Sequence, residues 1–80
     1  MNRSSLQAVR NPVLALPAAG RLGDLPPEAR RALSLLLRDL RADAATRADV
    51  AWRRRKGPMA VYWRAVSVYA GHIARAVERA

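Results

Sequence analysis

The dipeptide Gly57-Pro58 separates two long stretches in which apolar residues recur at helical spacing. Glycine suits the left-handed residue that often follows a helix, and proline cannot continue that helix but can open the next one. The dipeptide therefore predicts a tight connection between helices at about residues 26–56 and 59–79. Long helices joined by so short a connection pack antiparallel, so the expected fold is an all-α helical hairpin over residues 26–80.

The first helix has a clear start, because Asp24 can cap it and the two prolines that follow suit its first turn. Thr46 and Asp49 resemble a capping box, which leaves open a break near residues 43–46, although we favour one continuous helix. Its apolar stripe changes from leucine to alanine towards the apex: Ala29, Leu33, Leu36, Leu37, Leu40, Ala44, Ala48 and Ala51.

The second helix carries the larger side chains on one face: Met59, Tyr62, Trp63, Val66, Tyr69, Ala70, Ile73 and Val77. Large side chains on the second helix can fill the space beside the small side chains of the first. Near the apex we therefore expect alanines to face large residues, with Ala48 and Ala51 against Met59, Tyr62 and Trp63. Farther from the apex we expect leucines against smaller aliphatic residues, with Leu33, Leu36, Leu37 and Leu40 against Ala70, Ile73 and Val77.

A weaker apolar strip occupies another side of the second helix and indicates a second neighbour. Its members, with a bordering arginine, are Val61, Ala65, Val68, His72 and Arg75. The neighbour we favour is the N-terminal segment, residues 1–25, which we expect to be irregular and to lie across the hairpin. The alternatives are a second copy of the chain, giving a homodimer, or a target protein. A disordered tail is the alternative for the segment itself.

Positive charge gathers at the joint between the helices. The chain has a net charge of +9, and no acidic residue stands between Asp49 and Glu78. On the first helix, acid-first pairs at i,i+4 are expected, Asp43 with Arg47 and Asp49 with Arg53. The cations that follow are consecutive: Arg53, Arg54, Arg55 and Lys56.

This basic run has three interpretations. Cations in a last helical turn interact favourably with the helix dipole, which accounts for one or two of the charges. The run could instead hold a nucleic-acid backbone without sequence specificity, supported by Arg64. Trp52 would then stack on a base, although we favour core packing for it. The third interpretation is an acidic groove on a protein. After Pro58 the chain offers apolar residues where a DNA-recognition helix needs polar ones.

Catalysis has little basis in this sequence. There is no cysteine, His72 is the single histidine, and neither a phosphate-binding glycine loop nor a metal-ligand motif is present. We therefore expect a non-enzyme without cofactor or metal. The first nine residues lack a secretory signal, and Arg64 interrupts the best candidate for a membrane span, so we expect a cytoplasmic protein without integral membrane association.

The stretches Asn11-Pro12-Val13-Leu14, Leu25-Pro26-Pro27-Glu28-Ala29-Arg30 and Ala51 to Trp63 resemble small uncharacterised proteins of Mu-like transposable phages and prophages. The similarity covers about residues 11–75. It implies a small accessory protein of a temperate phage, acting in a bacterial host cell by binding rather than by catalysis.

Two functions follow as hypotheses. The first, which composition favours, is binding of an anionic partner, a nucleic-acid backbone above all, through the basic apex. The alternative is a host-directed interaction protein that inhibits or redirects an acidic host protein, such as an ATPase or a defence complex.

Overall fold

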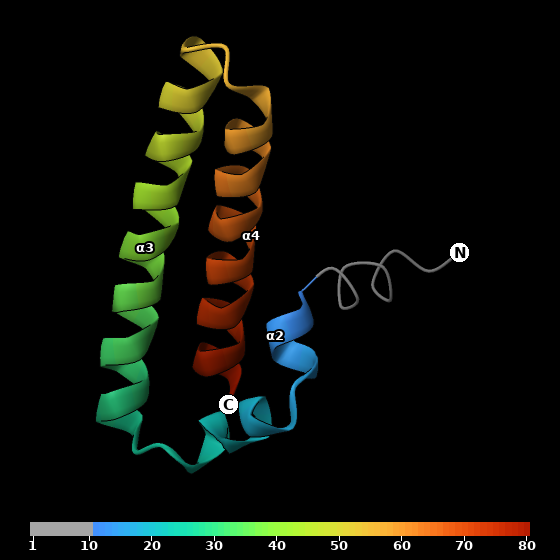
Figure 1. The fold of residues 1–80 in the computed structure, drawn as a ribbon. Coiled ribbons are helices and arrows are strands. Elements are labelled where there is room, and N and C mark those ends of the chain that lie inside the picture. Colours follow the sequence, from blue (N-terminus) through green and yellow to red (C-terminus); the bar gives the residue numbers. More distant parts are fainter. Residues whose placement is uncertain (1–10) are drawn as a thin grey trace.

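The structure is a computed structural model that describes residues 11–80, and two long helices packed antiparallel dominate it (Figure 1). The long helices are α3 (Pro27–Arg53) and α4 (Gly57–Arg79). Before them come the short helix α2 (Pro12–Ala15) and the 3₁₀ helix η1 (Pro17–Asp24). The predicted all-α helical hairpin is confirmed. The predicted segment before Asn11 lies outside the described residues.

Helix α3 runs without a break through residues 43–46, as we favoured. The Thr46 hydroxyl donates a hydrogen bond to the Ala42 carbonyl at 3.1 Å, inside the helix, instead of capping a new one. The expected cap at Asp24 is wrong, because Asp24 ends η1 and the residue before α3 is Pro26, without a side-chain cap.

The connection between α3 and α4 closes the end of α3 by backbone hydrogen bonds. The Lys56 N–H donates to the Ala51 carbonyl at 2.8 Å, and the Arg55 N–H donates to the Trp52 carbonyl at 3.0 Å. This pair of bonds is the Schellman motif, which needs a left-handed residue after the helix. Arg55 takes that conformation with φ 57°, whereas Gly57 is already the first residue of α4. The left-handed role predicted for the glycine is therefore wrong.

Small residues form the contact between the two long helices. The buried residues of α3 are Ser34, Ala44, Ala48 and Ala51, and those of α4 are Ala60, Ser67, Ala70, Gly71, Ala74 and Val77. The Ser67 hydroxyl donates to the Arg41 carbonyl at 3.0 Å. A Cβ atom on Gly71 would lie 3.2 Å from Cδ of Arg41, which shows how closely the helices approach.

Because the helices approach so closely, several large residues that were predicted to lie in the core are exposed. Leu36 and Leu40 are 55% and 47% exposed, and Met59 and Tyr62 are 46% and 55% exposed. The predicted core residues that are buried, as expected, are Ala44, Ala48, Ala51, Ala70 and Val77. Because alanine, serine and glycine let the helices lie close together, the seam is filled by small side chains and the large ones are placed on its flanks.

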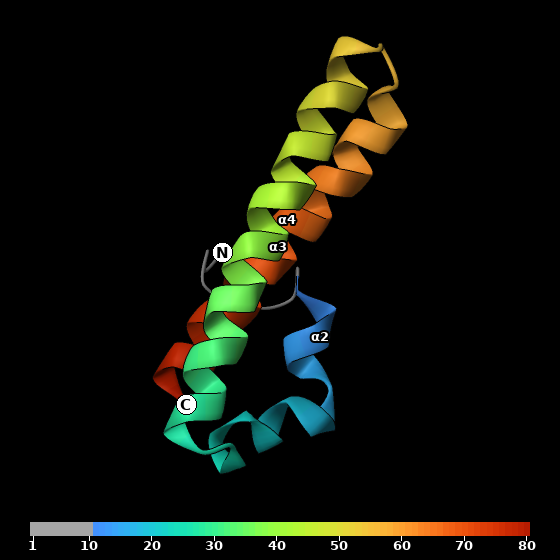
Figure 2. The same cartoon turned by 90° about the vertical axis from the view of Figure 1, so that its left-hand side faces the viewer.

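The N-terminal segment packs on α4, on the side away from α3 (Figures 1 and 2). Asn11 is fully buried and anchors it, because its Nδ2 donates to the Tyr69 carbonyl at 3.2 Å and its Oδ1 accepts from the Val13 N–H at 3.2 Å. Farther along, residues of α2 and η1 face Ala76 and Ala80. The segment consists of short helical pieces. Its described part, residues 11–24, does not cover Val61 and Val68, which are 68% and 42% exposed. Residues 1–10 of the neighbour predicted for that strip lie outside the described residues.

Within residues 11–80, no helix combines the length and the apolar character that crossing a membrane requires.

Candidate binding site at the helical apex

The apex of the hairpin carries an exposed, uncompensated cluster of cations. Arg53, Arg54, Arg55 and Lys56 are all exposed. The ion pairs that form within residues 11–80 are Arg38–Glu78 and Arg64–Asp49, so no described acid neutralises the cluster. Helix α4 also begins at this tip without a side-chain cap, which leaves first-turn amides that add positive potential. The described part of the apex therefore carries a positive potential.

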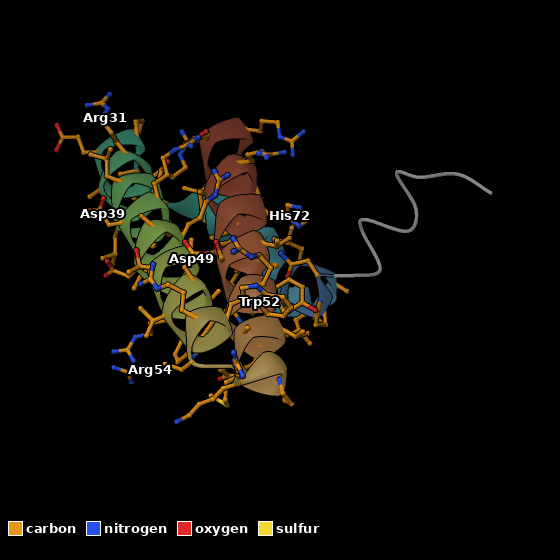
Figure 3. The ribbon with its side chains drawn as sticks, turned by 90° about the horizontal axis from the view of Figure 1, so that it is seen from above. Arg31, Asp39, Asp49, Trp52, Arg54 and His72 are labelled. Carbon is orange, nitrogen blue, oxygen red and sulfur yellow. The ribbon has the colours of Figure 1, made fainter. Side chains whose placement is uncertain are left out.

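The apex cations surround the tip instead of forming one flat patch. Residues 53 and 54 are successive positions at the end of a helix, so they project about 100° apart around its axis. In Figure 3 the Arg54 side chain points away from the hairpin on the outer side of α3, whereas Trp52 lies towards α4. A bound polyanion must therefore pass over the tip to contact several of these cations.

Trp52 is 70% exposed, so the core position that we favoured for it is wrong. It forms one end of a groove of about 600 Å³ between the long helices. The other lining residues are Ala48, Asp49, Ala60, Val61, Arg64, Ala65, Val68 and Tyr69. An indole beside free cations, at the edge of an apolar groove, can stack on a planar group and remain in contact with water.

Arg64 belongs to this groove and not to the tip. Its guanidinium donates a hydrogen bond to Oδ1 of Asp49 at 3.0 Å, joining α4 to α3. The expected pair of Asp49 with Arg53 is therefore wrong. Asp49 is the acid that sequence reasoning did not assign to the site, because its partner lies fifteen residues along the chain and across the hairpin.

The predicted partner face is divided by the structure. Val61, Ala65 and Val68 lie together in the groove beside Trp52, whereas His72 and Arg75 are not among its lining residues. Ala48 is buried, as the sequence pattern expected, and forms part of the floor of the groove, whereas Tyr69, also assigned to the core, is only half-buried there. Which residues line the groove depends on how the two helices are rotated relative to each other, and the sequence pattern does not contain that rotation.

On the other side of the hairpin, Arg47 lies over the ring of Trp63, with Cζ 5.1 Å from the ring centroid. This cation–π contact replaces the expected pair of Arg47 with Asp43. The rings of Tyr62 and Trp63 form a T-shaped pair, with the ring centroids 5.1 Å apart.

A second polar cluster holds the base of the hairpin, far from the apex. The Ser34 hydroxyl donates to Oε2 of Glu78, and the Arg38 guanidinium donates to both Glu78 oxygens at 2.8 Å. These hydrogen bonds, that of Ser34 first, hold the pKa of Glu78 below its ordinary value. The cluster joins α3 to α4 and has a structural role.

Within the described residues, no group of three or more His, Cys, Asp or Glu side chains gathers at a point where a metal ion could bind. Comparison with protein-family models, with curated proteins and with solved structures finds no match to this chain.

Proposed function

We propose that the chain is a small accessory protein that binds the phosphate backbone of single-stranded nucleic acid over its apex, without sequence specificity. The observation that carries the proposal is the run of four exposed, unpaired cations next to an indole that is 70% exposed. Proteins that bind single strands combine such cations with aromatic side chains on which bases stack. The resemblance to proteins of Mu-like phages agrees with an accessory role.

A single strand suits this tip better than a duplex does. The cations surround the end of a helical pair, and a flexible strand can bend over that end, whereas a duplex is stiff on this scale. Trp52 lies beside the cations on one side, where an unstacked base could reach it. The proposal therefore names single-stranded DNA or RNA as the ligand.

The test is a titration of a fluorescently labelled single-stranded oligonucleotide at several salt concentrations. Four phosphate contacts predict a log–log salt slope of about −3 for a single strand. The apex variant is Arg54→Ala with Arg55→Gly, glycine being chosen because residue 55 has φ 57°. Removing two contacts should make the slope shallower by about 1.4.

The matched control is Arg21→Ala with Arg31→Ala, which removes the same charge from exposed positions away from the apex. If net charge alone attracted the oligonucleotide, both double variants would weaken binding equally. The proposal requires the apex pair to weaken it more. Absence of binding by the unchanged protein at low salt would refute it.

Stacking is tested separately. Replacing Trp52 with Ala should weaken binding by about 1–3 kcal/mol, the usual contribution of one stacked base. Trp52→Phe keeps an aromatic face and should recover most of the loss. Equal binding by the unchanged protein, Trp52→Ala and Trp52→Phe would show that the indole does not contact the oligonucleotide. Binding would then be purely electrostatic.

The groove favours a second candidate function, recognition of an acidic host protein. It is lined mainly by apolar side chains and contains the Arg64–Asp49 pair, so an amphipathic segment with acidic flanks would fit it. This candidate predicts negligible affinity for oligonucleotides near physiological salt. It also predicts that one host protein stays bound after nuclease treatment and that Val61→Asp, within the groove, releases it.

A further inference from the structure

One face of the hairpin carries three rows of residues at seven-residue spacing. On α3 the rows are Leu33–Leu40–Arg47 and Leu36–Asp43–Val50, and on α4 the row is Met59–Val66–Ile73. Arg47 touches Trp63 across the two helices, and Met59 and Val50 line the same hollow as that pair. The contacts therefore place the three rows on one side of the molecule, which we term the heptad face.

The heptad face is poorly covered by the rest of the described chain. Leu36, Leu40 and Met59 are 55%, 47% and 46% exposed, and Leu33, Val66 and Ile73 are only half-buried. The N-terminal segment contacts α4 through other residues. An apolar surface of this length on a small protein marks an interaction site.

We propose that the heptad face binds the same face of a second copy of the chain, to form an antiparallel four-helix dimer. A strict seven-residue repeat packs along its whole length only against helices with a matching repeat, and a second copy has one. The face also continues the α3–α4 interface, since buried Ala44 and Ala51 of that interface lie three or four residues from its rows.

The size of the face matches what a stable dimer needs. Helix α4 has 23 residues. At about 1.5 Å per residue and a width of about 18 Å for two packed helices, the face projects roughly 600 Å², near the ~800 Å² that each partner buries in a typical interface.

Charge selects the antiparallel arrangement. A parallel dimer would place two clusters of four cations side by side. In an antiparallel dimer with its two-fold axis near residue 45 of α3, the clusters lie about ten residues on either side of that axis. They are roughly 30 Å apart, several times the ~8 Å Debye length of physiological salt.

The two charged residues of the face, Asp43 and Arg47, are of opposite sign and stand one helical turn apart. A two-fold axis midway between them brings Asp43 of each copy to Arg47 of the other. Asp43 has no ion pair with another residue of the described chain, so it is available for this contact.

The test measures mass by size exclusion with light scattering, on nuclease-treated full chain over a range of concentrations. The unchanged protein should elute at twice the 8.8 kDa of one chain. Leu40→Glu should elute at the mass of one chain, with its dimer dissociation constant raised at least about a hundredfold, because two copies of the leucine lose their burial.

The matched control is Leu35→Glu on the other side of α3. Leu35 is 60% exposed, so both substitutions add one charge at a position where the monomer tolerates it. Leu35→Glu should remain dimeric. A monomeric unchanged protein, a dimeric Leu40→Glu protein, or equal dissociation of both variants would overturn the proposal. Circular dichroism confirms that the variants are helical.

A charge exchange provides the second measurement and needs no apolar substitution. Asp43→Arg should weaken the dimer about tenfold by placing like charges together, and adding Arg47→Asp should restore most of the affinity. Failure of the double variant to recover, while the single variant weakens the dimer, would overturn the two-fold pairing. Oligonucleotides are absent throughout, so these results do not depend on the proposed function of the apex.

Discussion

Arg55 occupies a backbone conformation that glycine adopts without a steric penalty. The left-handed region costs an L-residue roughly 1–2 kcal/mol, partly offset in a glycine variant by the greater entropy of the unfolded chain. Arg55→Gly should therefore raise the free energy of unfolding by about 0.5–1 kcal/mol, seen as a higher Tm. Arg54→Gly is the control, since Arg54 has φ −86° and the same charge is lost. Equal effects of the two variants on Tm would contradict the prediction.

The same variant connects stability with function at the apex. Arg55→Gly should make the protein more stable and, if the apex binds nucleic acid, weaken that binding by removing a cation. Arg55 stands at a position where glycine would make the protein more stable. This arginine is therefore consistent with a functional role for its charge.

Glu78 makes the stability of the base of the hairpin depend on pH. Its pKa is lowered in the folded protein, because Ser34 and Arg38 donate hydrogen bonds to the carboxylate. The carboxylate therefore adds stability above its unfolded pKa of about 4.3, and this contribution is lost as the pH falls through the lower, folded value. Thermal melts from neutral pH to acid should show this loss.

Glu78→Gln should have a lower Tm at neutral pH and a weaker dependence on acid than the unchanged protein. Glu28→Gln, at an exposed position with no described ion pair, should keep the original dependence. Identical pH profiles for Glu78→Gln and the unchanged protein would exclude Glu78 as the source.

At the scale of elements, the closeness of α3 and α4 depends on small residues along their seam. Ala48 is 2% exposed, so Ala48→Leu must force the helices apart and should cost about 1–3 kcal/mol or more. Ala42→Leu, on the exposed side of α3, should change the free energy of unfolding by less than about 0.5 kcal/mol. Urea denaturation measures both. Equal effects would mean that the helices do not approach closely at Ala48.

At the scale of the whole molecule, Asn11 determines whether the N-terminal segment stays on α4. Asn11→Ala removes the hydrogen bond to the Tyr69 carbonyl and the one from the Val13 N–H. Breaking buried hydrogen bonds costs about 1–3 kcal/mol, which should release residues 12–24 before the hairpin unfolds. Limited proteolysis within η1 should therefore become faster while the hairpin's helical signal persists. An unchanged cleavage rate would show that other contacts hold the segment.

The sequence by itself determined the elements of this protein. Helix type, the continuous first helix and a joint just before Pro58 follow from apolar spacing and from the proline, whose effect acts within a few residues. The basic run at the apex was visible for the same reason, because charges at the end of a helix are exposed whatever the helix packs against.

Only the tertiary structure decided which of the apolar residues on each helix form the contact between the two helices. Sequence reasoning placed the largest apolar residues in the core, since these gain most from burial. The helices meet through Ala44 and Ala48 of the predicted stripe and through Ala74, which the pattern had not assigned to the core. This close contact leaves Leu36 and Trp52 exposed. The rotation and spacing of two helices depend on how all facing side chains fit together, and that fit is a property of the pair. The same long-range geometry joined Asp49 to Arg64, a contact that no local pattern contains.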